Sequence, residues 1–557
     1  MNKPWLNSYP KGISPEIEFK EYSSLVDMFE KTSEKFYSKT AFTNFGVKMS
    51  FGEIQNKSQN LSSFLQNELK LEKGARVAIM LPNILQYPIS TFSILKAGYI
   101  VENINPLFTE RELEIQLKDS RSEAIIILEN FAHNLEKIIK NTSIKHVIIT
   151  STGELLGFKG KLINFVLRNI KKMVPKYKIK NSLLFSDCIK KGSQYKFLNV
   201  KINLDDVAFL QYTGGTTGTV KAAMLTHKNI LANVLQVKEW LGKHLRYGED
   251  IAICALPLYH IFALTCNGLT FFNFGANNIL ISNPRDIKSF VKELRKHKFT
   301  FISGVNTLFN KLINDPNFKK CNFANLRISL GGGMQVQKTV AENWQKITGN
   351  VLSVGYGLSE TSPAASIDPI GNDKFTDSLG LPLPSTEFSI QDDKGKFLNF
   401  NEPGEICIKG PQVMKGYWEK EEETKEVLTV DGWFKTGDIG IMDQNGYTRM
   451  VDRKKDLIII SGFNVYPNEI EEVAMMHENI FEAGCIGILD SSGNENIKLF
   501  ASLMPNKKMD SDELITHCKK YLTKYKVPKI IEFIEEIPKS NVGKILRRKL
   551  RDKDKNV

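Results

Sequence analysis

A glycine- and threonine-rich segment stands in the first half of the chain, where residues 210–221 read LQYTGGTTGTVK. Three glycines let the backbone turn tightly and approach a ligand, and four threonines supply hydroxyl groups. Successive backbone N–H groups in such a loop can bind an anion. The Walker A register fails, because Lys221 does not directly follow the last glycine and no Ser or Thr follows it. The segment predicts a phosphate-binding loop after a buried strand, with a plain turn in a surface hairpin as the alternative.

On the N-terminal side of this loop, short β-branched runs alternate with segments of helical periodicity. The runs are residues 77–81, 124–128 and 147–149, and the helical segments include 90–97 and 111–118. Strands without polar alternation are typical of parallel sheets that are covered on both faces. The pattern therefore predicts an α/β fold with buried, largely parallel strands.

On the C-terminal side, the charged cluster 451–456 marks a domain boundary. It lies between a turn signal at 443–446 and the apolar residues 457–460. The remainder alternates predicted helices with predicted strands, which is typical of a small α+β domain. The helices are 467–477 and 511–521, and the strands are 482–489, 498–504 and 530–533. We therefore expect an N-terminal domain over 1–452 and a C-terminal domain over 453–557.

The composition of the chain limits which classes of protein and of binding partner fit it. The 557 residues hold 75 Lys and Arg against 62 Asp and Glu, a net charge of +13 that favours contact with nucleic acid, phosphorylated cofactors or anionic lipid. The seven cysteines are scattered and never form C-x-x-C, which argues against a zinc cluster or a disulfide framework. The first residues lack the apolar run of a signal peptide, so we expect a cytoplasmic protein.

Two segments raise the question of a membrane. Residues 251–284 contain no charged side chain, but Pro, Asn and Gly interrupt them, which favours a strand, turn, helix, turn and strand inside a core. Residues 155–186 hold eight Lys or Arg and no acid, with apolar residues mostly three or four apart. This predicts a basic amphipathic helix that either lies on an anionic membrane or packs on its own domain with a solvated face.

Two further segments carry groups suited to a nucleotide. In 355–361, Tyr356 can present its ring to a base and Glu360 can supply an oxygen to Mg²⁺. In 433–438, Asp438 follows a turn and can accept hydrogen bonds from two ribose hydroxyls. Each segment alone is weak evidence.

Taken in order along the chain, these segments resemble the adenylate-forming superfamily of acyl-CoA synthetases, luciferases and peptide-synthetase adenylation domains. The resemblance covers essentially the whole chain, and the flanking segments are most similar to bacterial long-chain fatty-acid–CoA ligases. The segments that carry it, besides the three above, are 83–88, 255–264, 410–414, 461–471 and 538–548.

The resemblance implies a large N-terminal domain built on mixed and parallel sheets and a small, mobile C-terminal domain that swings about a hinge near Lys455. It also implies a two-step reaction. A fatty carboxylate attacks the α-phosphate of ATP and releases pyrophosphate, and the thiol of CoA then displaces AMP. The implied cofactors and co-substrates are ATP, Mg²⁺ and CoA.

The resemblance assigns roles to particular residues. The phosphates would be held by Tyr212, Thr213, Gly214, Gly215, Thr216, Thr217, Gly218 and Lys221, and the adenine by Gly331, Gly332, Gly333, Tyr356 and Gly357. Asp438 would bind the ribose, and Arg453 would contact the ribose or a phosphate. CoA would be bound by Ser461, Gly462 and Phe463, and the metal by Glu360 with Thr217. The catalytic residues would be Thr213, His260, Glu360 and Lys544. Ordinary alternatives are a core role for His260 and a solvated basic run for Lys544.

Two residues depart from the family pattern: Ala222 stands where relatives usually carry glycine, and Ser359 where threonine is commoner. The rival hypotheses are a ligase for short-chain, aromatic or amino acids and a catalytically silent lipid- or nucleotide-binding protein. A nucleic-acid binder is disfavoured, because no recognition motif is present. We further expect peripheral contact with the inner face of an anionic cell membrane. The sequence leaves open whether the chain forms a homodimer.

Overall fold

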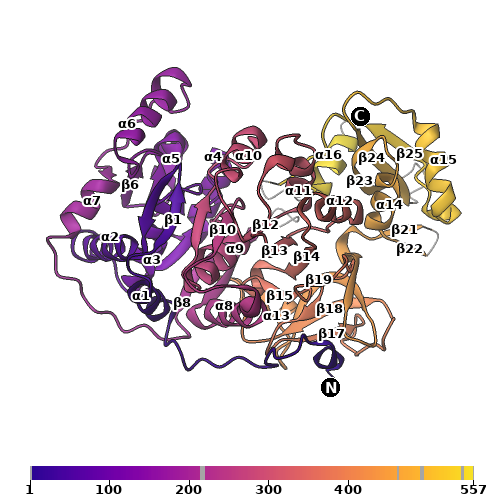
Figure 1. Cartoon of the computed structure of the whole chain (residues 1–557), viewed down its shortest axis with the longest axis horizontal. Helices are drawn as coiled ribbons and strands as arrows, with labels where there is room; N and C mark the ends of the chain where they lie inside the picture. The colour runs from indigo at the N-terminus through magenta and orange to yellow at the C-terminus, as the bar shows by residue number, and fades with distance from the viewer. Residues whose placement is uncertain (1–2, 214–219, 461–462, 490–494, 541–544, 556–557) are drawn as a thin grey trace.

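The computed structural model describes residues 3–213, 220–460, 463–489, 495–540 and 545–555. Two large sheets lie side by side in the N-terminal part, and a smaller unit follows at the C-terminus (Figure 1). In sheet order, the seven strands of the first sheet are β7 (Leu183–Leu184), β6 (His146–Thr150), β5 (Ala124–Leu128), β3 (Arg76–Met80), β4 (Ile100–Asn103), β8 (Val207–Thr213) and β9 (Lys221–Thr226).

Strand β3 shows why the sheet is buried on both faces. Val77 and Ile79 pack into one hydrophobic core, whereas Ala78 and Met80 pack into another beneath α4 (Glu110–Ser120) and α5 (Ala132–Ile138). The pairs β7–β6, β6–β5, β5–β3, β3–β4 and β4–β8 are all parallel. The predicted strands and the α/β fold class are confirmed.

The second sheet has nine strands, with parallel pairs at its centre and antiparallel pairs at its edges. In order they are β16 (Leu381–Pro382), β15 (Ala364–Ile367), β14 (Leu352–Gly357), β13 (Ile328–Gly332), β12 (Phe301–Gly304), β10 (Ile251–Cys254), β11 (Asn277–Leu280), β1 (Thr40–Asn44) and β2 (Val47–Ser50). One continuous core joins it to the first sheet.

The uncharged segment 251–284 lies in this core. It forms β10, the short helix α9 (Ile261–Ala263), the π-helix η7 (Leu264–Phe271) and β11, which is the predicted order. Among the described residues, no helix is both long and apolar enough to cross a bilayer.

The remaining helices of the N-terminal part cover the two sheets and the loops between them (Figure 1). They are α1 (Leu25–Lys35), α2 (Phe51–Phe64), α3 (Gln86–Lys96), α6 (Gly157–Phe165), α7 (Phe185–Gly192), α8 (His227–Leu241), α10 (Ile287–Leu294), α11 (Asn306–Ile313), α12 (Lys338–Thr348) and α13 (Glu421–Val427).

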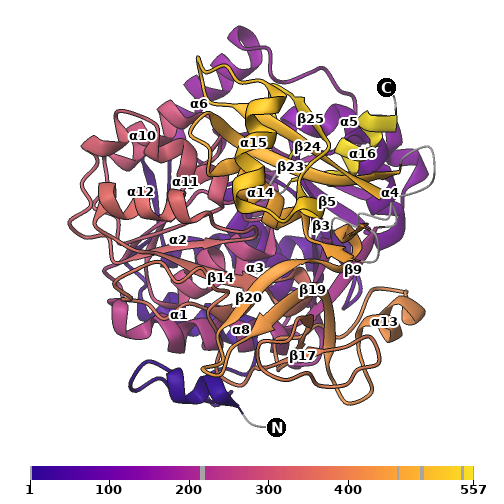
Figure 2. The same ribbon diagram turned by 90° about the vertical axis from the view of Figure 1, so that its right-hand side faces the viewer.

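A four-stranded antiparallel sheet leads to the C-terminal unit, which stands above it in Figure 2. Its strands are β17 (Glu387–Gln391), β18 (Gly404–Lys409), β19 (Phe434–Met442) and β20 (Thr448–Arg453). The turn predicted at 443–446 joins β19 to β20, and Gly446 adopts the positive φ of +85° that favours glycine there.

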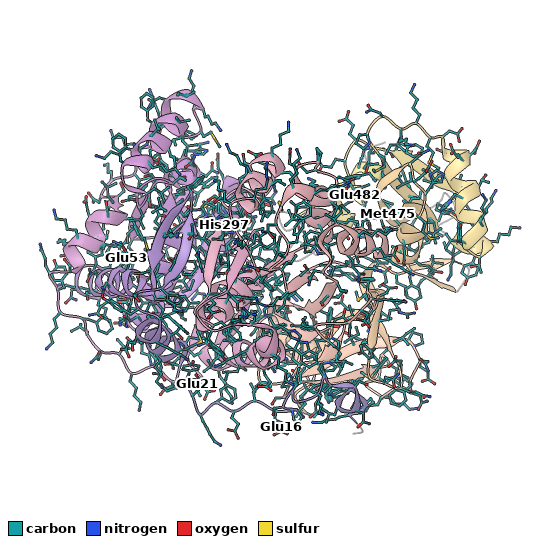
Figure 3. The ribbon with its side chains drawn as sticks, viewed as in Figure 1. Glu16, Glu21, Glu53, His297, Met475 and Glu482 are labelled. Atoms are coloured by element: carbon teal, nitrogen blue, oxygen red, sulfur yellow. The ribbon has the colours of Figure 1, made fainter. Side chains whose placement is uncertain are left out.

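The C-terminal unit has the predicted α+β pattern. It contains a hairpin of β21 (Ile458–Ile460) and β22 (Phe463–Val465), a sheet of β23 (Ile480–Leu489), β24 (Glu495–Leu503) and β25 (Ile530–Phe533), and the helices α14 (Pro467–Met475), α15 (Ser511–Tyr521) and α16 (Arg547–Lys555). Gln337, the residue before α12, donates a hydrogen bond to Sδ of Met475, so the two parts touch at the end of α14, where Met475 is labelled in Figure 3.

The basic segment 155–186 is helical over only about half its length. Helix α6 continues into the π-helix η5 (Val166–Ile170), and no helix follows until α7. Lys172 has a positive φ of +49°, and Pro175 disfavours helical backbone in the residue before it. The prediction of one amphipathic helix is therefore correct for 157–170 and wrong beyond it.

One buried carboxylate predicts how stability varies with pH. Glu102 of β4 accepts hydrogen bonds from Gln116 and Ser120, and from Ser122, and burial raises its pKa to about 7 despite those donors. Since the unfolded chain releases this proton near pH 4.3, the folded state binds it more tightly, and stability falls as pH rises from about 4 to 7. We expect Glu102→Gln to remove that loss, which is up to about 3 kcal/mol above pH 7.

Thermal unfolding of Glu102→Gln and wild type at pH 5 and pH 8 measures this difference. The gain should appear at pH 8 and shrink at pH 5. Glu110→Gln, on a side chain that is 44% exposed at the start of α4, is the matched control and should change neither value. An equal pH slope in the Glu102 variant and wild type contradicts the assignment.

Candidate active site

Strands β8 and β9 form an antiparallel hairpin that presents the two ends of the predicted phosphate loop. Thr213 pairs with Lys221, and Tyr212 pairs with Ala222. The Tyr212 hydroxyl donates to Asp119 Oδ2 at 2.6 Å, which anchors the end of β8 to α4. Burial and the nearby carboxylates raise the pKa of Tyr212 above its usual range, so the phenol stays a hydrogen-bond donor. The loop residues Gly214, Gly215, Thr216, Thr217 and Gly218 lie outside the described residues.

Ala222 is fully buried beside Ile100 and Leu210. Its methyl group therefore packs into a small apolar cluster at the base of the hairpin. Ser359 begins the 3₁₀-helix η9 (Ser359–Thr361), which also carries Glu360.

Lys221 and Glu360 are brought together by Tyr417, a residue that the sequence reasoning missed. The Tyr417 hydroxyl donates to Glu360 Oε1 at 2.8 Å, and the Lys221 ammonium lies 5.3 Å from the centre of the Tyr417 ring. The segment around Tyr417 runs along β9, since Met224 N–H donates to Gly416 O at 2.9 Å. The available signal was the adjacency of 415–418 to the family-like segment 410–414, but nothing local tied Tyr417 to Glu360.

A second cluster joins Tyr356, Asp438 and Arg453. Tyr356, in β14, donates its hydroxyl hydrogen bond to Asp438 Oδ2 at 2.8 Å. Arg453 Nε lies 3.4 Å from Asp438 Oδ1, because the two residues are directly paired between β19 and β20. Burial, and then the Asp438 charge, raise the pKa of Tyr356. The carboxylate of Asp438 is thus held at a fixed place, 3% exposed, by a phenol and a guanidinium.

Glycines allow the strand ends around Tyr356 to approach closely. A side chain on Gly357 would lie 1.8 Å from the carbonyl oxygen of Pro363. A side chain on Gly332 would lie 2.8 Å from the carbonyl oxygen of Gly355 and 3.1 Å from the ring of Phe262. Gly331 and Gly332 end β13 and Gly333 follows it, so all three predicted glycines flank Tyr356 across the parallel pair β13–β14.

His260 lies just before α9, two residues from that Phe262 ring. Its Nδ1 accepts a hydrogen bond from the Phe262 N–H at 3.3 Å and caps the helix. The ring is half-buried rather than enclosed in the core. This intermediate exposure does not match a fully buried core histidine, and the assignment of His260 as a site residue stays a prediction.

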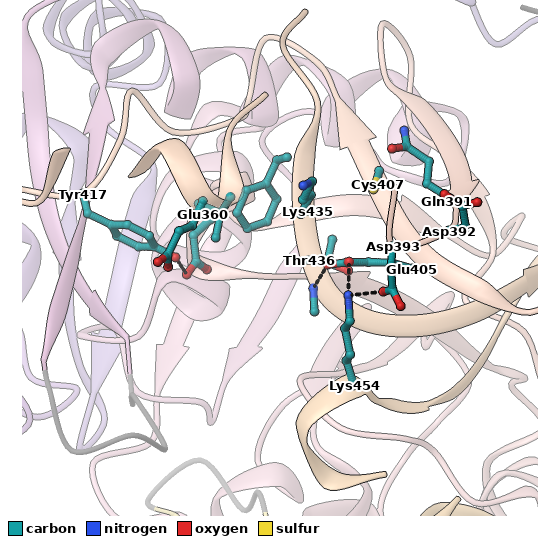
Figure 4. Close-up of a pocket in the computed structure, with 14 residues that line it drawn as sticks. Glu360, Gln391, Asp392, Asp393, Glu405, Cys407, Tyr417, Lys435, Thr436 and Lys454 are labelled. Carbon is teal, nitrogen blue, oxygen red and sulfur yellow. Dashed lines mark hydrogen bonds and ion pairs between the residues drawn. The ribbon is translucent and has the colours of Figure 1, made fainter. Parts of the chain in front are cut away.

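Between Glu360 and the segment 453–456 lies a polar cavity of about 360 Å³ (Figure 4). Glu360 and Tyr417 lie at one end, and Lys454, which pairs with Asp393 at 2.7 Å and Glu405 at 3.2 Å, lies at the other. Gly437, next to Asp438, also lines it. The cavity is thus lined by Glu360 and Tyr417 of the first cluster and reaches the residue next to Asp438 of the second.

The donor set around Glu360 fits a magnesium ion that is also held by phosphate oxygens. No group of three or more His, Cys, Asp or Glu within the described ranges is arranged to hold a metal by itself. Mg²⁺ in nucleotide sites usually takes one or two carboxylates, substrate phosphates and water. One carboxylate, fixed by Tyr417, meets that requirement; Thr217, the other predicted ligand, lies outside the described residues.

The C-terminal unit carries the other predicted residues. Lys455 lies in the 3₁₀-helix η10 (Lys454–Asp456) between β20 and β21. Phe463 begins β22, whereas Ser461, Gly462 and Lys544 lie outside the described residues. Two contacts fix the segment before α16. Lys539 and Ile545 form an antiparallel bridge, and Lys539 forms an ion pair with Glu482 of β23 at 2.6 Å.

Comparison with known proteins identifies the class. Residues 29–418 match the AMP-binding enzyme family, and residues 469–544 match its C-terminal domain. The chain therefore belongs to the AMP-binding enzymes. A crystal structure of the anthranilate CoA ligase AuaEII with anthranoyl-AMP has the same fold, with a TM-score of 0.85 and 23% identity over 96% of this chain and 98% of that one.

Within this family, the chain is similar over its full length to a group of bacterial proteins. It is 50% identical to the long-chain-fatty-acid–CoA ligase of Salmonella typhimurium, over 99% of this chain and 98% of that protein. It is 49% identical to the protein of that name from Yersinia pestis, over 100% of this chain and 99% of that one, and 38% identical to that of Bacillus subtilis, over 99% and 98%. The resemblance read from the sequence is confirmed.

Proposed function

We propose that this AMP-binding enzyme ligates long-chain fatty acids to coenzyme A at the expense of ATP. The observation that carries the substrate class is the 50% identity to a ligase of that name over 99% of the chain. The geometry supports the reaction class, because a phosphate-type cluster at Glu360 lines a polar cavity that reaches Gly437, the neighbour of Asp438 in the nucleotide-type cluster.

In the first step, a carboxylate oxygen of the fatty acid bonds to the α-phosphorus of ATP, and the bond to pyrophosphate breaks. Both reactants are anions, so the site must neutralise them and hold them in line. We assign Lys221, Thr213 and the loop 214–218 to the phosphates, and Lys544 to the oxygens around the α-phosphorus. Glu360 and Thr217 would hold Mg²⁺, which would neutralise further charge on the phosphates when bound.

The nucleotide would be oriented by the second cluster. Asp438 would accept hydrogen bonds from the ribose hydroxyls, and Arg453 would hold its carboxylate in place. Tyr356 would frame the adenine together with Gly331, Gly332, Gly333 and Gly357, whose lack of side chains lets the strand ends pack closely around the tyrosine.

In the second step, the thiolate sulfur of CoA bonds to the acyl carbon and the bond to AMP breaks. We assign Ser461, Gly462 and Phe463 to CoA and place His260 where the carboxylate and the thiol meet. The C-terminal domain 453–557 would rotate about Lys455 relative to the domain 1–452, so that one site carries out first one reaction and then the other. We further propose a cytoplasmic protein that contacts an anionic membrane peripherally, and a homodimer that sedimentation can test.

The test is AMP formation from ATP, Mg²⁺ and CoA with palmitate, octanoate, acetate, a cinnamate or mixed amino acids. Turnover that depends on the long-chain acid supports the proposal. Turnover only with another acid keeps the reaction and overturns the substrate. ATP binding without turnover on any acid favours the silent binding protein.

Tyr417→Phe tests whether the phenol positions the proposed metal ligand. Loss of a hydrogen bond to a charged group costs about 1.5–3 kcal/mol, so we expect the Mg²⁺ concentration for half-maximal ATP–pyrophosphate exchange to rise about tenfold or more. The matched control is Tyr9→Phe, which removes a hydroxyl that donates to Pro382 O outside the site. An unchanged Mg²⁺ dependence would mean that Glu360 needs no such support or does not bind the metal.

A further inference from the structure

Helix α6, the π-helix η5 and the residues just after η5 carry large apolar side chains on the outside of the protein. The exposed fractions are 86% for Phe158, 60% for Leu162, 56% for Phe165, 66% for Ile170 and 52% for Met173. Burying such side chains is the main driving force of folding, so this many within sixteen residues call for a partner. We call these five side chains the α6 apolar face.

The larger part of the apolar surface of α6 faces outward, because its inward side carries Gly160 and Asn164 besides one apolar residue, Ile163, that packs on the core. A side chain on Gly160 would lie 1.7 Å from the carbonyl oxygen of Gly153, so the helix backbone touches the domain there. Asn164 accepts a hydrogen bond from Gly153 N–H and donates one to Ser151, both at 2.8 Å. A helix that packed on its own domain with a solvated outer face would carry these groups the other way round.

The junction with η5 is also fixed. Arg168 makes a forked ion pair with the buried carboxylate of Glu129, with N–O distances between 2.8 and 3.1 Å. The i→i+5 hydrogen bond from Lys171 N–H to Val166 O, 2.8 Å long, widens the turn. In a wider turn, the five-residue step from Phe165 to Ile170 returns closer to the same side of the helix than it would in an α-helix.

Lysines surround the α6 apolar face. The exposed ones are Lys159, Lys161, Lys171, Lys172 and Lys176. Three carboxylates lie close by. Glu129 is neutralised by Arg168, Asp286 interacts electrostatically with Lys171 and caps α10 through Ser289, and Glu154 accepts hydrogen bonds from Thr150 and Ser186. The charge around the face is therefore strongly positive. Lys159 also donates to the carbonyl oxygen of Phe45 in the β1–β2 turn, a residue that is 38% exposed.

We propose that the α6 apolar face docks onto an anionic lipid bilayer, with its aromatic and aliphatic side chains among the acyl chains and its lysines at the lipid phosphates. An apolar face within a basic surround is the combination that interfacial helices use. In Figure 1, α6 projects from the upper left of the molecule, on the side away from the C-terminal unit. Docking there leaves that unit clear of the bilayer. The inference deepens the proposed function, because a long-chain acid partitions into lipid, but it rests on α6 and η5 alone.

Co-sedimentation with vesicles of phosphatidylglycerol and phosphatidylethanolamine, against pure phosphatidylcholine, tests the proposal without ATP, CoA or acid. Wild type should bind the anionic vesicles preferentially. Phe158→Ser/Leu162→Ser/Phe165→Ser should lower the partition coefficient at least about tenfold, and Lys161→Gln/Lys171→Gln about fivefold per lysine. Matched controls are Leu198→Ser/Tyr521→Ser and Lys519→Gln/Lys520→Gln, on exposed side chains outside α6 and η5.

Insertion can be read directly at one position. All seven cysteines are buried, so Leu162→Cys can be labelled selectively with an environment-sensitive fluorophore. Its emission should shift to the blue with anionic vesicles, whereas the same label on Leu489→Cys, 70% exposed in the C-terminal unit, should not shift. Turnover of albumin-delivered palmitate should be equal in wild type and the triple variant, while turnover of vesicle-delivered palmitate falls in the variant.

Three results overturn the proposal. The wild type does not bind anionic vesicles, the triple variant binds them as tightly as the wild type does, or the variant loses dimers without losing vesicle binding. The last result would assign the face to a second copy of the chain. If vesicle binding behaves as expected but no acid is activated, the docking surface stands and the proposed activity fails.

Discussion

Lys544→Ala is expected to lower acyl-adenylate formation about 10²–10³-fold, the loss found when a charge-stabilising donor is removed from a transition state. The carboxylate and the α-phosphate repel each other, and the resemblance gives Lys544 the place between them. The transfer of a preformed acyl-adenylate to CoA should change less, because the bonds of that step form and break at the acyl carbon and not at phosphorus.

ATP–pyrophosphate exchange measures the first half-reaction, and acyl-CoA formation from synthetic palmitoyl-AMP measures the second. Lys549→Ala, an exposed lysine five residues further on in α16, is the matched control and should retain both activities. Equal loss of both half-reactions in the Lys544 variant would contradict a role confined to adenylation.

Arg547→Met is expected to destabilise the C-terminal unit by about 3–5 kcal/mol, the cost of removing one partner from a buried ion pair. Arg547 makes a bidentate contact with Glu471 at 2.9 Å and lies 3.2 Å from Asp456 Oδ2 and 3.9 Å from Asp452 Oδ1. Without the guanidinium, three largely buried carboxylates lose their shared counter-charge.

Hydrogen exchange within 463–489 and 495–540 measures the effect, which should appear as faster exchange in β23, β24 and α14. Arg548→Met provides a control at the adjacent position, where the side chain is 58% exposed and lies 4.0 Å from Asp552. Equal protection in the two variants would contradict a structural role for the buried cluster. Because Asp452 ends the N-terminal domain as proposed, the variant should also weaken the coupling across the hinge.

Much of the fold could be predicted because it depends on local pattern. The helix 511–521 and the strand 530–533 have the predicted bounds, and the buried runs at 77–81 and 124–128 are strands to within a residue. Continuous β-branched runs indicate burial on both faces, whichever strands become neighbours. The basic segment was harder, since its apolar spacing continued through Val174 while Pro175 and the backbone of Lys172 ended the helix earlier.

For the candidate site too, some features could be predicted from the sequence and others could not. The sequence by itself determined which residue types stand in which order, namely a glycine- and threonine-rich loop, then Tyr356 and Glu360, then Asp438 and Arg453, and this order was enough to identify the family. Only the tertiary structure decided that Tyr417 holds Glu360, that Tyr356 donates to Asp438, and that α6 turns its apolar side outward. The reason is physical: these contacts join residues far apart in the chain or depend on which side of a helix the domain covers, and both are set by strand register and packing rather than by local periodicity.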